Sequence, residues 1–301
     1  MSTLYGLPSG VLNFQYMQEG TGTTTRGIFS TGTTAVFIGQ NPQLGFGSDL
    51  GTFMNYVNGS RDAAHALHSV HMLQLPLTFP ACILQTMTFL KRGINLADGI
   101  QYTFSGCLRE TIAATTNYLK LKGCLIAAGA FGIAGSEPLQ AQTTLVGNLS
   151  AYDSNAPTNW SFAAVPTTAP YLSSGMGTAT SITVRDVDTG VNYTPDVRSW
   201  AVGFNNGIAP IPHCGADTFA DFIPTQRGLQ VSLSINKKDL NIWGIHNLHH
   251  DTNIYISIST PGVTFTGTGG LLDPAQLTFS SDSPNIEVYT MKCKVGSLAA
   301  A

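Results

Sequence analysis

Polar and hydrophobic residues alternate in three separate runs along the last third of the chain. In residues 229–235, 254–258 and 289–295, every second position is Leu, Val, Ile, Tyr, Met or Cys, and the positions between are mostly polar. A period of two gives a strand one buried and one wet face. Segments rich in Gly, Pro and Asn separate the runs. This region is therefore predicted to be a sheet that a second sheet or a neighbouring subunit covers.

The rest of the chain also favours strands over helices. One helix is predicted at residues 60–71, because Ser60 can cap its first turn and the apolar residues from Ala63 to Val70 have helical spacing. Residues 216–222 are predicted to be a short helix or a loop ended by Pro224. Further strands are predicted at residues 34–39, 73–79, 82–90, 100–104, 182–184, 191–193 and 200–204.

These elements predict a mainly β fold with two β-sandwich or partial-barrel domains, short helices and long loops. Residues 1–135 form the expected N-terminal β domain, whose weakly patterned residues 1–33 are interpreted as an extended arm. Residues 136–178, rich in Ser, Thr, Ala and Pro, are predicted to be a linker or long loop. Residues 179–301 form the expected C-terminal sandwich. The similar order of elements in the two halves suggests an internal duplication.

The composition points to an assembled protein. Charged residues make up only 10% of the chain, against roughly 25% in an average soluble protein. Charge keeps free monomers soluble and apart, so a surface this poor in charge is expected to be hidden largely in an assembly. The alternative is a soluble β protein built of small residues.

The charge distribution argues against tight binding of nucleic acid. The formal net charge is −3, and it divides into +1 for residues 1–150 and −4 for residues 151–301. No basic run is present, so the chain lacks the electrostatic pattern that holds phosphates. An acidic surface would instead let DNA slide past without sticking.

The cysteines and the N-terminus give no sign of export or of a membrane helix. The five cysteines show no C-x-x-C spacing, and Cys82, Cys124 and Cys293 lie in apolar or alternating runs. They are interpreted as small buried hydrophobic residues in a reducing compartment. The N-terminal residues lack the charged start and apolar stretch of a signal peptide. No window reaches the run of about 20 apolar residues that a membrane helix needs.

Two groups of histidines contain potential metal ligands. His65, His68 and His71 would spread over the predicted helix, and the H-E-x-x-H pattern of zinc proteases is absent. A second group follows Trp243 and is interpreted as a polar loop rather than as a set of ligands. The members of this second group are His246, His249, His250 and Asp251.

Enzymatic motifs are equally weak. Residues 188–190 spell the Asp-Thr-Gly of aspartic proteases, but a β-turn explains the triplet and a second copy is missing. The glycines of residues 129–135 lack the dinucleotide-binding register, and Cys214 beside His213 says little about geometry. No catalytic, cofactor-binding or metal-binding residue is assigned, no cofactor is expected, and the protein is predicted not to be an enzyme.

The C-terminal half resembles the tail tube, or major tail, proteins of tailed bacteriophages over about residues 180–301. The resemblance rests on the order of patterned segments. Within the last of them, Ala275, Leu277, Asn285 and Val288 match an "Ala-x-Leu, polar stretch, Asn, alternating strand" order. The segments are 181–187 (SITVRDV), 195–204 (PDVRSWAVGF), a loop with Pro210, Pro212 and Ala216, 229–236 (LQVSLSIN), Asp239-Leu240, 254–259 (IYISIS), 273–285 (DPAQLTFSSDSPN) and 286–295.

This resemblance implies a virion structural protein, assembled in the host cytoplasm, whose copies polymerise into stacked rings of a tail tube. The family implies sheets that join between subunits and other tail proteins as partners. It also implies that DNA passes through the lumen without specific binding and that the protein has no membrane partner. An acidic lumen would draw on Asp186, Asp188 or Asp196. Two alternatives remain open: a capsid, coat or fibre β-sandwich protein, and a carbohydrate-binding or hydrolytic β domain.

Overall fold

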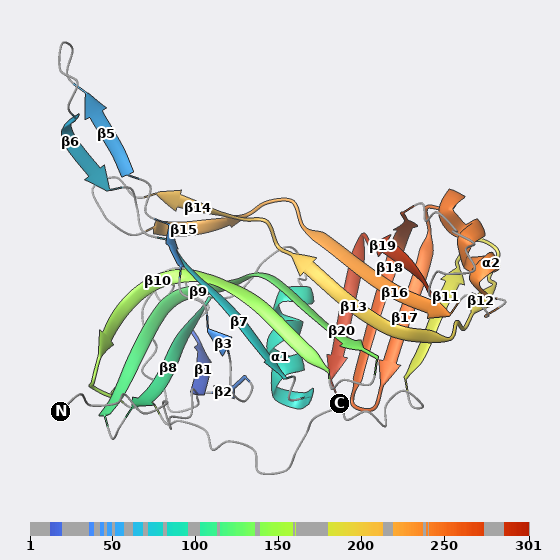
Figure 1. Cartoon of the computed structure of the whole chain (residues 1–301), viewed down its shortest axis with the longest axis horizontal. Coiled ribbons are helices and arrows are strands. Elements are labelled where there is room, and N and C mark those ends of the chain that lie inside the picture. Colours follow the sequence, from blue (N-terminus) through green and yellow to red (C-terminus); the bar gives the residue numbers. More distant parts are fainter. Residues whose placement is uncertain are drawn as a thin grey trace, which may run out of the picture.

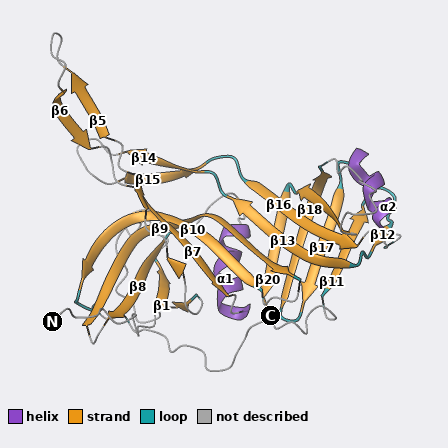
Figure 2. Cartoon of the chain, in the orientation of Figure 1, coloured by secondary structure: helices purple, strands orange, loops and turns teal. Residues whose placement is uncertain are grey.

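The computed structural model of the chain is mainly β with two short α-helices in its described part, which confirms the predicted fold class (Figure 2). The structure describes residues 13–19, 36–38, 43–44, 47–49, 52–56, 63–68, 72–80, 83–95, 103–112, 115–135, 139–158, 160, 180–212, 219–236, 239, 241–273 and 286–300.

Six antiparallel strands form the middle of the largest sheet, in the order β7, β10, β9, β13, β16 and β19. The 20-residue strand β9 joins the two halves of the molecule. Its first part pairs with β8 (Phe104–Ile112), and its last part, from Ala128 to Ala134, pairs with β13. The bounds of the six strands are Met72–Pro80 (β7), Gln140–Asp153 (β10), Thr115–Ala134 (β9), Val197–Asn205 (β13), Gly228–Asn236 (β16) and Ile286–Lys292 (β19).

A second layer completes a sandwich in the C-terminal half. Strand β18 belongs to both layers: its first six residues pair with β20, and after Gly269, which has a φ of +61°, Leu271 and Leu272 pair with β19. Glycine suits this bend because it adopts positive φ at little cost. The strands of this layer are β11 (Ser181–Asp186), β12 (Asn192–Tyr193), β17 (Ile254–Thr260), β18 (Val263–Leu272) and β20 (Val295–Ala300).

In the N-terminal half the large sheet curves around helix α1 (Ile83–Ile94), as Figure 1 shows. The buried ring of Phe89 on α1 lies 4.8 Å from the ring of Tyr16 and 5.5 Å from that of Phe104. Aromatic pairs at such distances add to the burial of their surface. Four shorter strands complete this half: β1 (Asn13–Gln18), β2 (Val36–Phe37), β3 (Gln43–Leu44) and β4 (Gly47–Asp49).

Two hairpins lie outside the layers, and a helical segment lies at the opposite end of the molecule (Figure 1). Each hairpin is a separate two-stranded sheet. The hairpins are β5 (Thr52–Tyr56) with β6 (Ala63–His68), and β14 (Ile208–Pro212) with β15 (Phe219–Pro224). The helical segment is α2 (Asn241–Asn247) followed by the 3₁₀ helix η3 (Leu248–His250).

One cluster of buried side chains runs through both halves. It includes Phe104 and Leu121 in the N-terminal half, Phe131 on the joining strand, and Val231 and Phe265 in the C-terminal sandwich. Full burial of such a side chain stabilises the fold by about 1.5–3 kcal/mol. The alternation predicted for residues 229–235 and 254–258 is confirmed, because each buried residue is followed by a more exposed one in β16 and β17.

The helix predicted at residues 60–71 is wrong in its described part. Residues Ala63–His68 form strand β6 and pair antiparallel with β5. Small and neutral residues there are compatible with either structure, so pairing with a partner strand overrides the helical spacing. The helical arrangement of His65, His68 and His71 is lost with it, and His71 lies outside the described residues.

The strand predicted at residues 82–90 is also wrong, because Ile83–Ile94 form helix α1. Met87, Leu90 and Ile94 are fully buried and are spaced three and four residues apart, which is one face of a helix. An apolar run of this length does not distinguish a buried strand from a buried helix.

Three further predictions need correction. Residues 13–18, within the predicted arm, form β1, where Phe14 and Tyr16 are buried and the backbone pairs with β8. Residues 140–153, within the predicted linker, form β10. The predicted helix or loop at residues 216–222 is strand from Phe219 onward. β1 pairs with a strand distant in sequence, whereas β10 and β15 pair with the strands just before them. In each case pairing with another strand overrode the local composition.

Candidate functional site

The six central strands align so that one side of the sheet presents short, uncharged side chains. The register places Gln142, Ala130, Gly203 and Gln230 in one row across four neighbouring strands, and the next row contains Gln140, Gly132, Ala201 and Ser232. We call this side the uncharged face. Its members are Gln74, Pro76 and Thr78 (β7), Gln140, Gln142 and Thr144 (β10), Ala128, Ala130, Gly132 and Ala134 (β9), Ser199, Ala201, Gly203 and Asn205 (β13), Gln230, Ser232 and Ser234 (β16), and Val288, Thr290 and Lys292 (β19).

Lys292 is the single ionisable residue among these members, and it lies at the end of β19. Its Nζ atom lies 3.0 Å from Oδ1 of Asp273, so an acid accompanies the one positive charge. A surface of hydroxyl, carboxamide and methyl groups without net charge neither holds nor repels a polyanion strongly. The uncharged face therefore offers a wide, electrically neutral surface.

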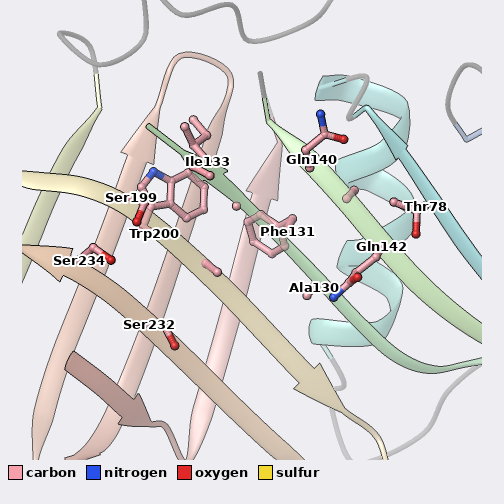
Figure 3. A pocket seen from close by; sticks show the side chains of 14 residues that line it. Thr78, Ala130, Phe131, Ile133, Gln140, Gln142, Ser199, Trp200, Ser232 and Ser234 are labelled. Atoms are coloured by element: carbon pink, nitrogen blue, oxygen red, sulfur yellow. The ribbon is translucent and has the colours of Figure 1, made fainter. Parts of the chain in front are cut away.

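The uncharged face is hollowed where β9 meets β13, in a shallow concavity of about 290 Å³ (Figure 3). At this point β9 and β13 lie unusually close together, and Gly132 permits it because a Cβ atom at this position would meet the Trp200 carbonyl oxygen and the Ala201 backbone. The concavity is lined mostly by apolar groups, which include parts of Phe131, Ile133 and Trp200, together with polar residues such as Gln140 and Ser199. No acid, base or thiol of the described residues lines it, so its Ser and Thr hydroxyls have no lining base to activate them as nucleophiles.

The opposite side of the same strands packs into the core. Trp200 and Phe131 are buried there, with ring centroids 5.9 Å apart. Sugar sites commonly use an exposed aromatic ring as a stacking platform, whereas these rings are 5% and 2% exposed. Desolvation raises the pKa of the buried Tyr289 to about 12, and nearby Glu287 adds to the rise, so this hydroxyl stays protonated at neutral pH.

One edge of the six strands is open in the described part of the chain. β19 pairs with β16 along its whole length on one side, whereas on its other side only Met291 and Lys292 pair with β18. Val288 on this strand is 58% exposed and Leu271 beside its end is 44% exposed. At the far edge, β7 pairs with the short strands β3 and β4. An open strand edge is a template for pairing with another chain.

The second histidine group lies on a short helical segment. His246 lies on α2 and His249 and His250 on η3, so the predicted loop is helical. The His249 and His250 rings lie 3.6 Å apart, and Nδ1 of His249 bonds the His246 carbonyl. Among the described residues, no three His, Cys, Asp or Glu side chains are placed to hold a metal ion.

The Asp-Thr-Gly triplet is a turn, as the sequence suggested. Gly190 has a φ of +77°, and its N–H donates to the Asp186 carbonyl at 2.9 Å. The Asp188 carboxylate accepts a hydrogen bond from Asn253 at 3.1 Å. These contacts account for the triplet structurally.

The acids considered for a lumen lie away from the uncharged face. Asp186 is buried at the end of β11 in the second layer, and the Thr189 hydroxyl and two backbone N–H groups donate to its carboxylate. The Thr189 hydrogen bond in particular lowers the pKa of Asp186. Asp188 and Asp196 are exposed, and neither is a member of the uncharged face. The regular rows of the sheet therefore present a neutral surface rather than an acidic one.

The described cysteines are buried thiols. Desolvation raises the pKa of Cys107 to about 12 and that of Cys293 to about 11, and it also raises the pKa of Cys124. Thiols with such values are not nucleophiles at neutral pH. The interpretation of Cys124 and Cys293 as buried hydrophobic residues is confirmed, and Cys82 lies outside the described residues.

Sequence reasoning identified individual strands of the uncharged face but missed the face itself. The polar positions of 229–235 were visible as the wet side of one strand. The order in which β9, β10 and β13 join to it depends on pairing between residues about 70 positions apart, such as Ala201 with Gly132. A row of Ser, Gln, Ala and Gly at alternating positions in several strands was the available signal.

Comparison with known proteins assigns no family. No protein-family model matches the chain, and no curated protein is significantly similar to it. Within the described parts of the chain, no helix combines the length and apolar character needed to cross a membrane.

Proposed function

We propose that this protein is a virion structural protein whose copies join into stacked rings of a bacteriophage tail tube, with the uncharged face lining the bore. The observation that carries the proposal is the continuous six-stranded sheet, with one neutral side and the other side buried in the core. A bore lined in this way would let DNA pass without holding its phosphates.

The edges of the sheet support the ring. The open side of β19 in one copy offers backbone N–H and C=O groups to the next copy, and exposed Val288 and Leu271 add apolar surface beside it. Joining such edges around a closed ring would leave no strand unpaired. The contact is heterologous, because the β19 edge of one copy meets a different edge of its neighbour.

The number of strands favours a ring of three copies. With about 4.8 Å between strands and a tilt of about 40°, eighteen strands close into a barrel about 36 Å across. Side chains occupy about 5 Å on each side, half the spacing of packed sheets, which leaves a bore of about 26 Å. Two copies would leave a bore of only about 14 Å, whereas six would open it to about 62 Å. Of these, three copies best match the width of duplex DNA.

The assembly state tests the proposal directly. Electron microscopy of concentrated protein in negative stain is expected to show rings or tubes with an axial hole, and native mass spectrometry is expected to give a repeating unit of three 31.8 kDa chains. Closed shells would instead indicate a coat protein. A chain that stays monomeric at all concentrations would overturn the proposal.

Charge placed on the uncharged face tests the bore. In assembled Ser232→Lys rings, lysines from every copy converge on the bore, so duplex DNA is expected to bind and to dissociate as salt rises. Ser257→Lys, on β17 in the second layer, is the matched control and should leave DNA binding at the wild-type level. Equal DNA binding by both variants in gel-shift assays would show that Ser232 does not face the bore.

A further inference from the structure

A second concavity opens beside the uncharged face, where β13 ends and β16 begins. Its volume is about 600 Å³, which falls within the range of roughly 300–1,000 Å³ that is usual for small-molecule sites. Ala130 and Ala201 of the uncharged face contribute small apolar groups to its wall. Arg227 and Lys292 are the charged residues among those described in its lining, so we call this concavity the Arg227 pocket.

Arg227 carries a positive charge that no acid among the described residues accompanies. One arm of its guanidinium donates to the Ile94 carbonyl at the C-terminal end of α1, and its buried Nε–H has no acceptor in the described part of the chain. Burial lowers the pKa of Arg227, and no described acid counteracts this effect. Arginine nevertheless stays protonated at neutral pH. A half-buried cation without a counterion is costly, so an anion beside it would be stabilised.

The other polar groups of the pocket point to the same kind of ligand. The Asn205 carboxamide oxygen accepts a hydrogen bond from the Gly207 N–H at 2.9 Å, which leaves the Asn205 Nδ2 group to donate. Lys292 adds a second cation, although its Nζ atom lies 3.0 Å from Oδ1 of Asp273. Burial raises the pKa of Cys293 to about 11, so this lining thiol is neutral at pH 7. Cations and amide donors without an acid among them suit an oxyanion.

We propose that the Arg227 pocket binds a small organic anion, whose phosphate or carboxylate group pairs with the Arg227 guanidinium and whose apolar part packs against Ala130 and Ala201. A guanidinium forms charge-assisted hydrogen bonds with either oxyanion. The volume of the pocket leaves room for an organic group beside the oxyanion. The site does not depend on the proposed function. In a tube, the bound anion would also neutralise Arg227 beside the uncharged face.

A small anion fits the pocket better than the backbone of a nucleic acid does. Proteins that hold nucleic acids spread Lys and Arg along a surface, so that several phosphates are neutralised together. The residues of the uncharged face that border the pocket on β16, Gln230 and Ser232, are neutral. One unaccompanied cation in a concavity is instead suited to a single oxyanion group.

Isothermal titration calorimetry on the full chain tests the class of ligand. The anionic probes are phenyl phosphate and benzoate, and benzyl alcohol is their uncharged counterpart. At least one anionic probe is expected to bind at one site per chain, about tenfold or more tightly than benzyl alcohol and less tightly as salt rises. The tighter of the two anions identifies phosphate or carboxylate as the preferred group. Absence of saturable binding by both anions, or equal binding of benzyl alcohol, overturns the proposal.

Two variants locate the site. Arg227→Gln removes the cation and is expected to weaken binding of the anionic probe by about tenfold or more. Arg198→Gln, which removes an exposed arginine of β13 outside the pocket, is the matched control and should bind like the wild type. Gly203→Leu obstructs the pocket but keeps Arg227, and it should cause a similar loss. A Cβ atom at Gly203 meets no atom within 4 Å, so this variant is expected to fold.

Circular dichroism confirms that each variant is folded before binding is compared, and Gly203→Leu decides the question if Arg227→Gln does not fold. Wild-type affinity in either folded variant places the anion elsewhere and overturns the proposal. Gel-shift assays with duplex DNA give the remaining contrast. Loss of DNA binding in Arg227→Gln, without binding of phenyl phosphate or benzoate by the wild type, would identify a nucleic-acid contact instead of a small-molecule site.

Discussion

Single polar side chains stabilise positions where the strands depart from regular pairing. Glu19 is buried, and its carboxyl group accepts hydrogen bonds from the Ser105 hydroxyl at 2.9 Å and from the Gly123 N–H at 2.8 Å. Gly123 has a φ of +59° and lies beside a register shift between β8 and β9. The Glu19 carboxylate thus accepts hydrogen bonds from donors that the interrupted β8–β9 pairing does not engage.

We therefore expect Glu19→Ala to lower the free energy of unfolding by about 3 kcal/mol, because two donors lose their acceptor in a buried site. Urea denaturation measures the change. Glu110→Ala removes a half-buried glutamate from the neighbouring strand β8 and should cost much less. Equal losses in the two variants would contradict the role given to Glu19.

Asp186 makes stability depend on pH. Hydrogen bonds from Thr189, and then from the backbone, lower the pKa of Asp186 in the folded chain. A lowered pKa means that the stabilisation is complete above the unfolded-state value, about 3.9, and is lost as the pH falls through the folded value. Wild-type protein should therefore lose more stability than Asp186→Asn when the pH falls below about 4. Thermal unfolding at several pH values measures this difference, and parallel curves would refute it.

At the scale of elements, β9 and β13 hold the two halves together through small residues. Their paired segments are rich in Ala and Gly, and this composition lets the two strands approach closely at the concavity. On β13, the Phe204 ring packs over Gly129 of β9 and Gly93 of α1. The lack of side chains at these two glycines lets α1 lie close to the sheet. The contact between halves is therefore set by the absence of side chains as much as by their presence.

Two glycine substitutions test this contact. Gly132→Ala should destabilise the fold by about 1–3 kcal/mol, because its Cβ atom would meet the backbone of Trp200 and Ala201. Gly203→Ala, on the partner strand, meets no atom within 4 Å and should be neutral or slightly stabilising. Chemical denaturation distinguishes them. A destabilisation as large at Gly203 would show that strand flexibility, rather than close approach, explains the glycines.

On the scale of the whole molecule, the halves share one core and a second junction at the end of α1. The Asn95 side chain donates to the Leu298 carbonyl at 3.0 Å and accepts from the Leu298 N–H at 2.7 Å. It thus joins the helix of the N-terminal half to the last strand of the C-terminal half. Residues 1–135 and 179–301 remain the predicted domains, and a common core predicts that they unfold together.

Calorimetry is expected to show a single unfolding transition with equal calorimetric and van't Hoff enthalpies. Asn95→Ala should shift this transition down by a few degrees without splitting it, because two hydrogen bonds are lost from a junction that β9 and β13 still hold. Two separate transitions in the wild type would show that the halves are independent.

Several features followed from the sequence because they depend on neighbouring residues. Period-two alternation predicted β16 and β17 and the inward side of Leu233, and Asp-Thr-Gly predicted the turn before β12. The mainly β class and the low surface charge were visible in the same way. Local steric preference and burial of one face decide these properties, and both are written in short segments.

Only the tertiary structure decided whether the ambiguous segments form helix or strand, and where the candidate site lies. Residues 83–94 became a helix because the sheet curves around them, and residues 63–68 became a strand because β5 pairs with them. The uncharged face arises where strands from both halves align, as at Gly132 with Ala201. Pairing of strands so far apart in sequence costs loop-closure entropy, and only many contacts formed together offset this cost. No local sequence pattern can therefore specify the pairing.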